Sequence, residues 1–273
     1  EIRSRGLGDV YKRQFIDSAT LRENVVSLAR NIGYVPRSKR AAKARVEFNI
    51  TGFSESTTSI SIEAGVFANA GVNNTIYTYA LPQRILIPVN AEEAVGVVDI
   101  FQGQFLEKQW TVNLSQPNQR YVLPNDGIDT STLRVYVKES AASTVQTEYK
   151  MSDSIVKVTG ESNIFLIQET SDEKYELIFG DGIFGKKLQS GNVIRATYIK
   201  TNGAEGNGAS SFIFVGSIKD ESGASVSGTR AYMRTLIASE NGDDIESVQS
   251  IRNYAPRRLS LIHISEPTRP YLI

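Results

Sequence analysis

The chain has 273 residues, no cysteine, one histidine, and 30 basic against 30 acidic residues. The absence of cysteine excludes thiol nucleophiles and disulfides, and the charge balance gives no support for binding to nucleic acid or another polyanion. No apolar run reaches the roughly 20 residues that a membrane-spanning helix needs.

The two ends of the chain are related through their coding sequence. The segments SRGLGDVYKRQ (4–14) and LSLIHISEPTR (259–269) can be encoded by opposite strands of one DNA segment. This relation is typical of a sequencing-library adapter translated at both ends of a gene fragment. We therefore expect 1–14 and 259–273 to be adapter-derived and without a fold, and the rest to be a central fragment of a longer protein. Because the only histidine, His263, lies in the second of these segments, the rest has neither imidazole nor thiol ligands for a metal.

Helical periodicity marks the segment 15–45. Thr20 and Glu23 form a capping box, and Gly33 is a helix stop signal. A second, short helix is predicted over 38–45 from its helix-forming composition. The apolar positions of the first helix form one stripe at helical spacing: Leu21, Val25, Leu28, Ala29 and Ile32.

From Arg45 to about 218 the chain is a series of alternating apolar and polar runs separated by Gly, Asn and Asp turns. Such runs predict antiparallel sheets of the sandwich or barrel type. A shift in composition divides them into a first β domain (46–140), a linker (141–149) and a second β domain (150–218). The predicted fold class is therefore mainly β with flanking helices.

The segment 219–258 is predicted to be helical, with two helices broken at Asn241–Gly242. In this interpretation Asp243, Asp244 and Glu246 lie in the first turn of the last helix, where their charges complement the helix dipole.

The stretch FGDGIFGKKLQSGN (179–192) satisfies two phosphate-binding patterns, G-x-G-x-x-G and G-x-x-x-x-G-K. Both patterns require a helix directly after the glycines, because the helix N-terminus holds the phosphate. Here another turn and an alternating strand follow instead. We therefore predict a structural turn, with Gly182 or Gly185 at a positive φ angle, and no nucleotide, metal or other cofactor.

The same stretch and the following strand and turn resemble the signature of the baseplate J-like family of contractile phage tails. The resemblance also extends to ATLRENVVSLARNIGYVPRS, ISIEAGVFA and ENGDDIESVQSIRNYAP, which are similar to the T-even-type wedge proteins of that family. Departures are Leu188–Gln189, where a proline-containing approach is usual, and Asn202, where glycine is common. The matching positions are Gly180, Asp181, Gly182, Gly185, Gly191, Tyr198, Gly203, Gly206 and Asn207.

This resemblance implies a structural, non-enzymatic subunit of a tail baseplate wedge, located in the virion and assembled in the host cytoplasm. It implies contacts with other wedge proteins through a helical bundle, and dimers that link wedges into a ring. Leu21, Val25, Leu28 and Ile32 are then interface candidates, although packing within their own domain is an equal alternative. No binding to nucleic acid, membrane or small-molecule substrate is expected.

The alternative function is a β-rich carbohydrate-binding or hydrolytic tail protein. It would require converging carboxylates or an exposed row of aromatic side chains. The candidates are Asp126 and Asp129, more simply a turn, and Trp110, more simply a core anchor. The sequence favours the structural function.

Overall fold

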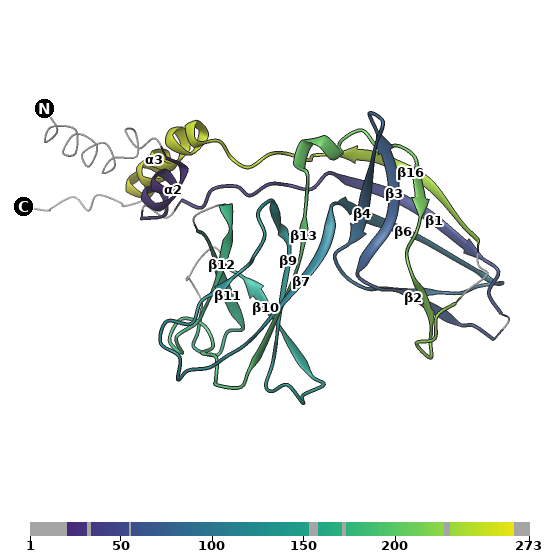
Figure 1. Cartoon of the computed structure of the whole chain (residues 1–273), viewed down its shortest axis with the longest axis horizontal. Coiled ribbons are helices and arrows are strands. Elements are labelled where there is room, and N and C mark those ends of the chain that lie inside the picture. Colours follow the sequence, from purple (N-terminus) through teal and green to yellow (C-terminus); the bar gives the residue numbers. More distant parts are fainter. Residues whose placement is uncertain are drawn as a thin grey trace, which may run out of the picture.

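The structure is a computed structural model, and it describes residues 21–31, 34–54, 56–152, 158–170, 173–226 and 230–264. The described part is mainly β, with two helices and two nearly closed, barrel-like sheets, which confirms the predicted mainly β class. Figure 1 shows a helix pair at one end, one β lobe at the other end, and a second β lobe beneath the connection between them. Neither helix has the length and apolar character needed to cross a bilayer.

The first lobe surrounds a core that includes Phe48, Phe67 and Tyr79. Its six-stranded sheet has the order β14-β3-β4-β6-β1-β16, and a three-stranded sheet has the order β15-β2-β5. The strands are β1 (Lys43–Thr51), β2 (Ser59–Ile62), β3 (Gly65–Val72), β4 (Thr75–Leu81), β5 (Ile85–Pro88), β6 (Glu93–Gln102), β14 (Phe212–Phe214), β15 (Ile218–Asp220) and β16 (Arg230–Glu240).

The second lobe is one seven-stranded sheet in the order β7-β13-β9-β10-β11-β12-β8, around a core that includes Leu123, Phe165 and Tyr198. All its pairs are antiparallel except β10 with β11. Its strands are β7 (Gln104–Thr111), β8 (Tyr121–Val122), β9 (Ile128–Lys138), β10 (Gln146–Met151), β11 (Ile164–Glu169), β12 (Tyr175–Phe179) and β13 (Val193–Lys200).

The helix pair consists of α2 (Arg22–Asn31) and α3 (Val248–Ile264). Val25, Val26 and Ala29 of α2 are buried against Ile251 and Ala255 of α3. The short side chains of Ala29 and Ala255 fit a close contact between the helices. The predicted capping residue Thr20 lies outside the described residues, and α3 continues as far as Ile264, into the terminal segment that was expected to have no fold.

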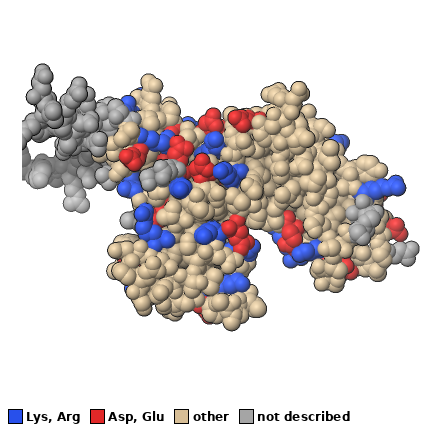
Figure 2. Space-filling view, in the orientation of Figure 1, with Lys and Arg blue, Asp and Glu red and all other residues tan. Residues whose placement is uncertain are grey.

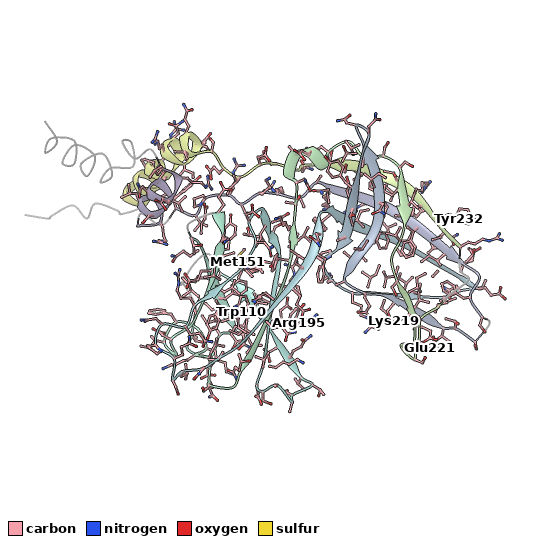
Figure 3. All side chains as sticks on the ribbon, viewed as in Figure 1. Trp110, Met151, Arg195, Lys219, Glu221 and Tyr232 are labelled. Atoms are coloured by element: carbon pink, nitrogen blue, oxygen red, sulfur yellow. The ribbon has the colours of Figure 1, made fainter. Side chains whose placement is uncertain are left out.

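The predicted helix before Asn241 is wrong, because residues 230–240 form strand β16. The residues are good helix formers, but their side chains alternate: Ala231 and Met233 pack against the first core, whereas Tyr232, 63% exposed, lies at the outer edge of the lobe (Figure 3). Pairing with β1 over Thr51↔Arg230 to Lys43↔Glu240 outweighs local helix propensity. The predicted helix over 38–45 is wrong for a similar reason, since this segment is extended and enters β1.

The two lobes do not follow one another along the chain as predicted. Strands β7 to β9, predicted in the first β domain, pair in the second lobe, and β14 to β16 return to complete the first. Only Gly103 separates β6 from β7, so composition does not mark the passage from one lobe to the other. The second lobe is therefore an insertion between β6 and β14.

The tight turn between β5 and β6, closed by backbone hydrogen bonds between Asn90 and Glu93, has unfavourable residues. Ala91 and Glu92 occupy its two central positions with φ angles of 50° and 62°, a left-handed conformation that favours Asn and Gly. We expect Ala91→Asn combined with Glu92→Gly to raise the free energy of unfolding by about 1–2 kcal/mol, measured by urea denaturation.

The hairpin between β3 and β4 provides the matched control. Asn73 and Asn74 hold the same positions there, with φ angles of 47° and 65°. Asn73→Ala combined with Asn74→Glu should therefore lower the stability by a similar amount. An unchanged urea midpoint for both double variants would contradict the strain argument.

Candidate functional site

Two extended segments, residues 34–42 and 241–247, connect the helix pair to the first lobe; we call them the crossing segments. They run side by side above the second lobe (Figure 1) and pair through backbone hydrogen bonds. The amide of Arg40 donates to the carbonyl of Asp243 at 2.9 Å, and the amide of Asp243 donates back at 3.1 Å. Asp243 therefore lies in an extended segment, which corrects the prediction that it belongs to the first turn of a helix.

Glu246 is the buried acid of the crossing segments, with 4% of the residue exposed. Its carboxylate accepts hydrogen bonds from the Tyr34 hydroxyl (2.7 Å), the Arg37 amide (3.0 Å) and the Ser250 hydroxyl (2.6 Å). Burial favours the neutral acid, but these bonds outweigh it and the pKa of Glu246 is lowered. The ionised side chain thus joins the first crossing segment to the start of α3. Ser247 caps that helix, since its hydroxyl accepts from the Ser250 amide.

Arg22 of α2 joins the helix pair to the second lobe. Its Nε and Nη2 atoms donate to the two carboxylate oxygens of Glu169, at the end of β11, at 2.8 and 3.1 Å. Its Nη1 atom donates to the backbone carbonyl of Glu246. Burial is the largest effect on Glu169 and raises its pKa, while the bonds from Arg22 act in the opposite direction. One guanidinium therefore binds α2, β11 and the second crossing segment together.

The passage from the second lobe back to the first is the junction turn, residues 201–208. It contains the 3-10 helix η2 (Gly203–Gly206). The buried Gln102, at the end of β6, binds this turn: its Oε1 accepts from the Thr201 hydroxyl (2.7 Å) and the Asn202 amide (3.0 Å). The carbonyl of Gly206 accepts from the hydroxyls of Tyr79 and Ser239, both at 2.7 Å. Strands β4, β6 and β16 of the first lobe therefore all hold the junction turn.

The side chain of Asn207 forms two hydrogen bonds with the backbone of the second crossing segment. Its Nδ2 donates to the carbonyl of Gly242 at 2.9 Å, and its Oδ1 accepts from the Gly242 amide at 2.8 Å. A Cβ atom at Gly242 would lie 2.4 Å from the carbonyl oxygen of Gly203 and 2.9 Å from the Cβ of Ala42. Only glycine allows these three segments to approach so closely.

The other motif residues form the outer turn, residues 180–191, between β12 and β13. The Oδ1 atom of Asp181 accepts from the amides of Phe184 (2.9 Å) and Ile183 (2.8 Å), and these bonds lower its pKa. Gly182 and Gly185 both have the predicted positive φ, at 99° and 88°. Strand β13 follows the turn, without the helix that a phosphate-binding loop requires. The remaining motif residues are Gly180, which bridges to Lys187, and Gly191, in the turn before β13.

The predicted interface stripe is only partly available to another molecule. Val25 is fully buried between the two helices, and Leu28 is partly buried in the same cluster. Leu21 is 50% exposed. Ile32 lies outside the described residues. The assignment of the stripe to an interface stays a prediction, with Leu21 as its accessible member.

The residues weighed for the alternative function have structural contacts. Asp126 pairs with Lys200 at 2.8 Å, whereas the buried Asp129 accepts from the Ala41 amide at 2.8 Å. Within the described ranges no three His, Cys, Asp or Glu side chains gather closely enough to hold a metal ion. Trp110 packs edge-on against Tyr121, with ring centroids 6.1 Å apart, inside the second lobe (Figure 3).

Sequence reasoning missed Arg22, Glu169 and Gln102. Each binds a residue 99 or more positions away along the chain, so no local spacing marks them. One feature of the sequence could have pointed to the contact between Arg22 and Glu246, since both residues lie in stretches that resemble the wedge proteins.

Lys/Arg and Asp/Glu side chains alternate along the band between the helix pair and the lobes (Figure 2). This arrangement, in which charged groups bind one another across chain segments, is that of a structural joint. Residues 109–225 match the family model described as "Bacteriophage baseplate wedge protein gp6, third domain". The chain is also 24% identical over 270 residues to the baseplate wedge protein gp6 of Enterobacteria phage T4, covering 92% of this chain and 39% of that protein.

The chain thus spans less than half the length of the relative it matches. The two matches support a baseplate wedge-like family, in agreement with the resemblance found in its motifs. They likewise support a structural role and a location in the tail baseplate of the virion.

The close contact at Gly242 predicts that space, and not backbone conformation, limits this position. We expect Gly242→Ala to lower the free energy of unfolding by about 1–3 kcal/mol, because the added Cβ must displace backbone atoms. Thermal or urea denaturation measures the effect. Gly71→Ala is the matched control, since no atom lies within 4 Å of its Cβ position; equal stability of the two variants would refute the steric argument.

The lowered pKa of Glu246 predicts that the junction is sensitive to acid. An acid with a lowered folded pKa contributes fully above its ordinary pKa, and the contribution is lost as the pH falls through the folded value. We expect Glu246→Gln to be less stable than the parent at pH 7, and to lose less further stability between about pH 5 and pH 3. Urea midpoints against pH measure both effects.

Ser250→Ala is the companion variant, because it removes one of the three hydrogen bonds and leaves the carboxylate. Its pH profile should lie between those of the parent and Glu246→Gln. Parallel profiles for all three proteins would show that this carboxylate does not determine the acid response.

Proposed function

We propose that the chain is a structural subunit of a contractile tail baseplate wedge, acting in baseplate assembly and in the linkage of neighbouring wedges. The relation to baseplate wedge protein gp6 supports the first part of the proposal. The single observation that carries the second is the junction, which fixes a helix pair to two β lobes through Arg22, Glu246 and the crossing segments.

The helix pair is the proposed contact with other wedge proteins and with a second copy of the chain. Helix α2 spans ten residues and buries one face against α3, which leaves its other face for a further partner. Leu21, directly before α2, and Tyr254 of α3 are 50% and 54% exposed. Additional helices packed on these side chains would form a bundle around the pair.

The junction gives this proposal a mechanical basis. A force applied to α2 reaches the second lobe through the bidentate ion pair between Arg22 and Glu169. The same force reaches the first lobe through the paired crossing segments and the contact of Asn207 with Gly242. In a ring of such subunits, a movement of the helical contacts during sheath contraction would move both lobes as well.

The test is reconstitution with the other wedge proteins encoded by the same phage, measured by size-exclusion chromatography with light scattering. We expect the parent chain to enter a complex and Leu21→Glu to weaken that complex at least tenfold, because it places a charge in the proposed apolar contact. Ile76→Glu is the matched control, since Ile76 is 76% exposed on the first lobe, away from the helix pair.

Each outcome has a separate meaning. A chain that joins none of the wedge proteins would overturn the proposed function. A complex that tolerates Leu21→Glu as well as Ile76→Glu would place the contact on another surface. Thermal denaturation of each variant checks that the fold is intact before binding is compared.

A further inference from the structure

Four loops gather at the end of the second lobe that lies opposite the helix pair; we call it the distal end. Strands β7, β9 and β12 end there, and β10, β11 and β13 begin near it. The loops hold one another: the Gly185 amide donates to the Thr159 carbonyl at 3.1 Å, and Asn192 Nδ2 donates to the Glu139 carbonyl at 3.0 Å. The loops are 112–119, 139–145, 158–163 and 180–192.

The outer turn presents two neighbouring apolar side chains at this end. Ile183 is 70% exposed and Phe184 is 50% exposed, although the backbone beneath them is fixed by the Asp181 carboxylate. Leu114 and Val145, on neighbouring loops, are 59% and 73% exposed. Covering a large apolar side chain contributes about 1.5–3 kcal/mol, and a fixed backbone reduces the entropy lost on binding. The turn therefore has the properties of an anchor for a partner surface.

A polar hollow of about 470 Å³ adjoins this anchor. Within the described part of the chain, Lys186 and Lys187 form no ion pair with an acidic side chain, and the buried Oδ1 atom of Asn163 has no hydrogen-bond donor. Glu139 also lines the hollow. In Figure 2 the lower end of this lobe carries mostly uncharged side chains on the visible face. The charge of Lys187 acts on Asp181 in the same turn, but among the described residues neither ammonium group has a carboxylate within ion-pair distance. Both can therefore bind carboxylates of another protein beside an apolar surface.

We propose that the distal end is a docking surface for a partner protein that covers Ile183 and Phe184 with an apolar pocket and places carboxylates against Lys186 and Lys187. The proposal deepens the proposed function and rests on it, since it names a second contact surface of the same subunit. Charge complementarity selects the acidic partner. A nucleic acid is disfavoured because two lysines beside Glu139 do not form a basic track.

The test uses the full chain with p-benzoylphenylalanine in place of Phe184, irradiated together with the wedge proteins of the same phage. We expect a cross-link to one of these proteins at a site where apolar residues adjoin Asp or Glu. Substitution at Tyr232, an exposed aromatic residue on the first lobe, is the control and should cross-link at least tenfold less.

Lys186→Glu combined with Lys187→Glu should reduce the cross-link at least tenfold, whereas Lys150→Glu, on β10, should leave it unchanged. Lysines introduced at the acidic residues of the cross-linked partner should restore it. A complex that still assembles, but shows no more cross-linking at 184 than at 232, would overturn the docking surface and leave the proposed function intact. Binding of a 40-nucleotide DNA probe that the double lysine variant abolishes would also overturn it. Failure of the chain to join any wedge protein would overturn both.

Discussion

The close approach of three backbone segments at Gly242 is the constraint on which the rest of the structure depends. The backbone carbonyl of Gly203, the side chain of Ala42 and the side-chain amide of Asn207 all lie against this residue. Their contact fixes how the crossing segments lie against the junction turn. The packing leaves no space for a side chain, so the crossing segments meet the junction turn through backbone contact. The second lobe is joined to the helices by the ion pair of Arg22 with Glu169.

Buried charged side chains add hydrogen bonds of fixed direction to this contact. Arg22 divides its donors between Glu169 and the carbonyl of Glu246, so one guanidinium holds two parts of the chain at the same time. Burial opposes ionisation of both acids, yet their pKa values move in opposite directions. At Glu169 burial, together with the charges of Glu173 and Glu246, outweighs the bonds from Arg22, whereas at Glu246 the hydrogen bonds outweigh burial. Buried ion pairs of this kind contribute little net stability, since desolvation offsets attraction, but they penalise every arrangement in which a partner is missing. They therefore specify one geometry.

Much of the fold could be predicted from periodicity, because alternation marks strands such as β1, where Val46, Phe48 and Ile50 are buried in turn. The outer turn could also be predicted, because a turn and a strand follow its glycines in the sequence. A phosphate site needs a helix at that place. Strand β16 could not, because its helix-forming residues are held in a strand by pairing with β1, a contact far away in sequence. Arg22 and Glu169 are 147 positions apart, and their contact exists only after both lobes and the helices are in place.

The insertion of the second lobe between β6 and β14 has a consequence for biosynthesis. As the chain leaves the ribosome, β1 to β6 emerge before the second lobe, and β16, the outer partner of β1, is the last of the described strands to emerge. Until then β1 carries an unpaired edge, which is the form of strand most prone to join another chain. The second lobe, with its own strands and core, can complete itself during this interval. A nascent first lobe is therefore the vulnerable intermediate, and the time that translation needs to reach Glu240 sets how long it is exposed.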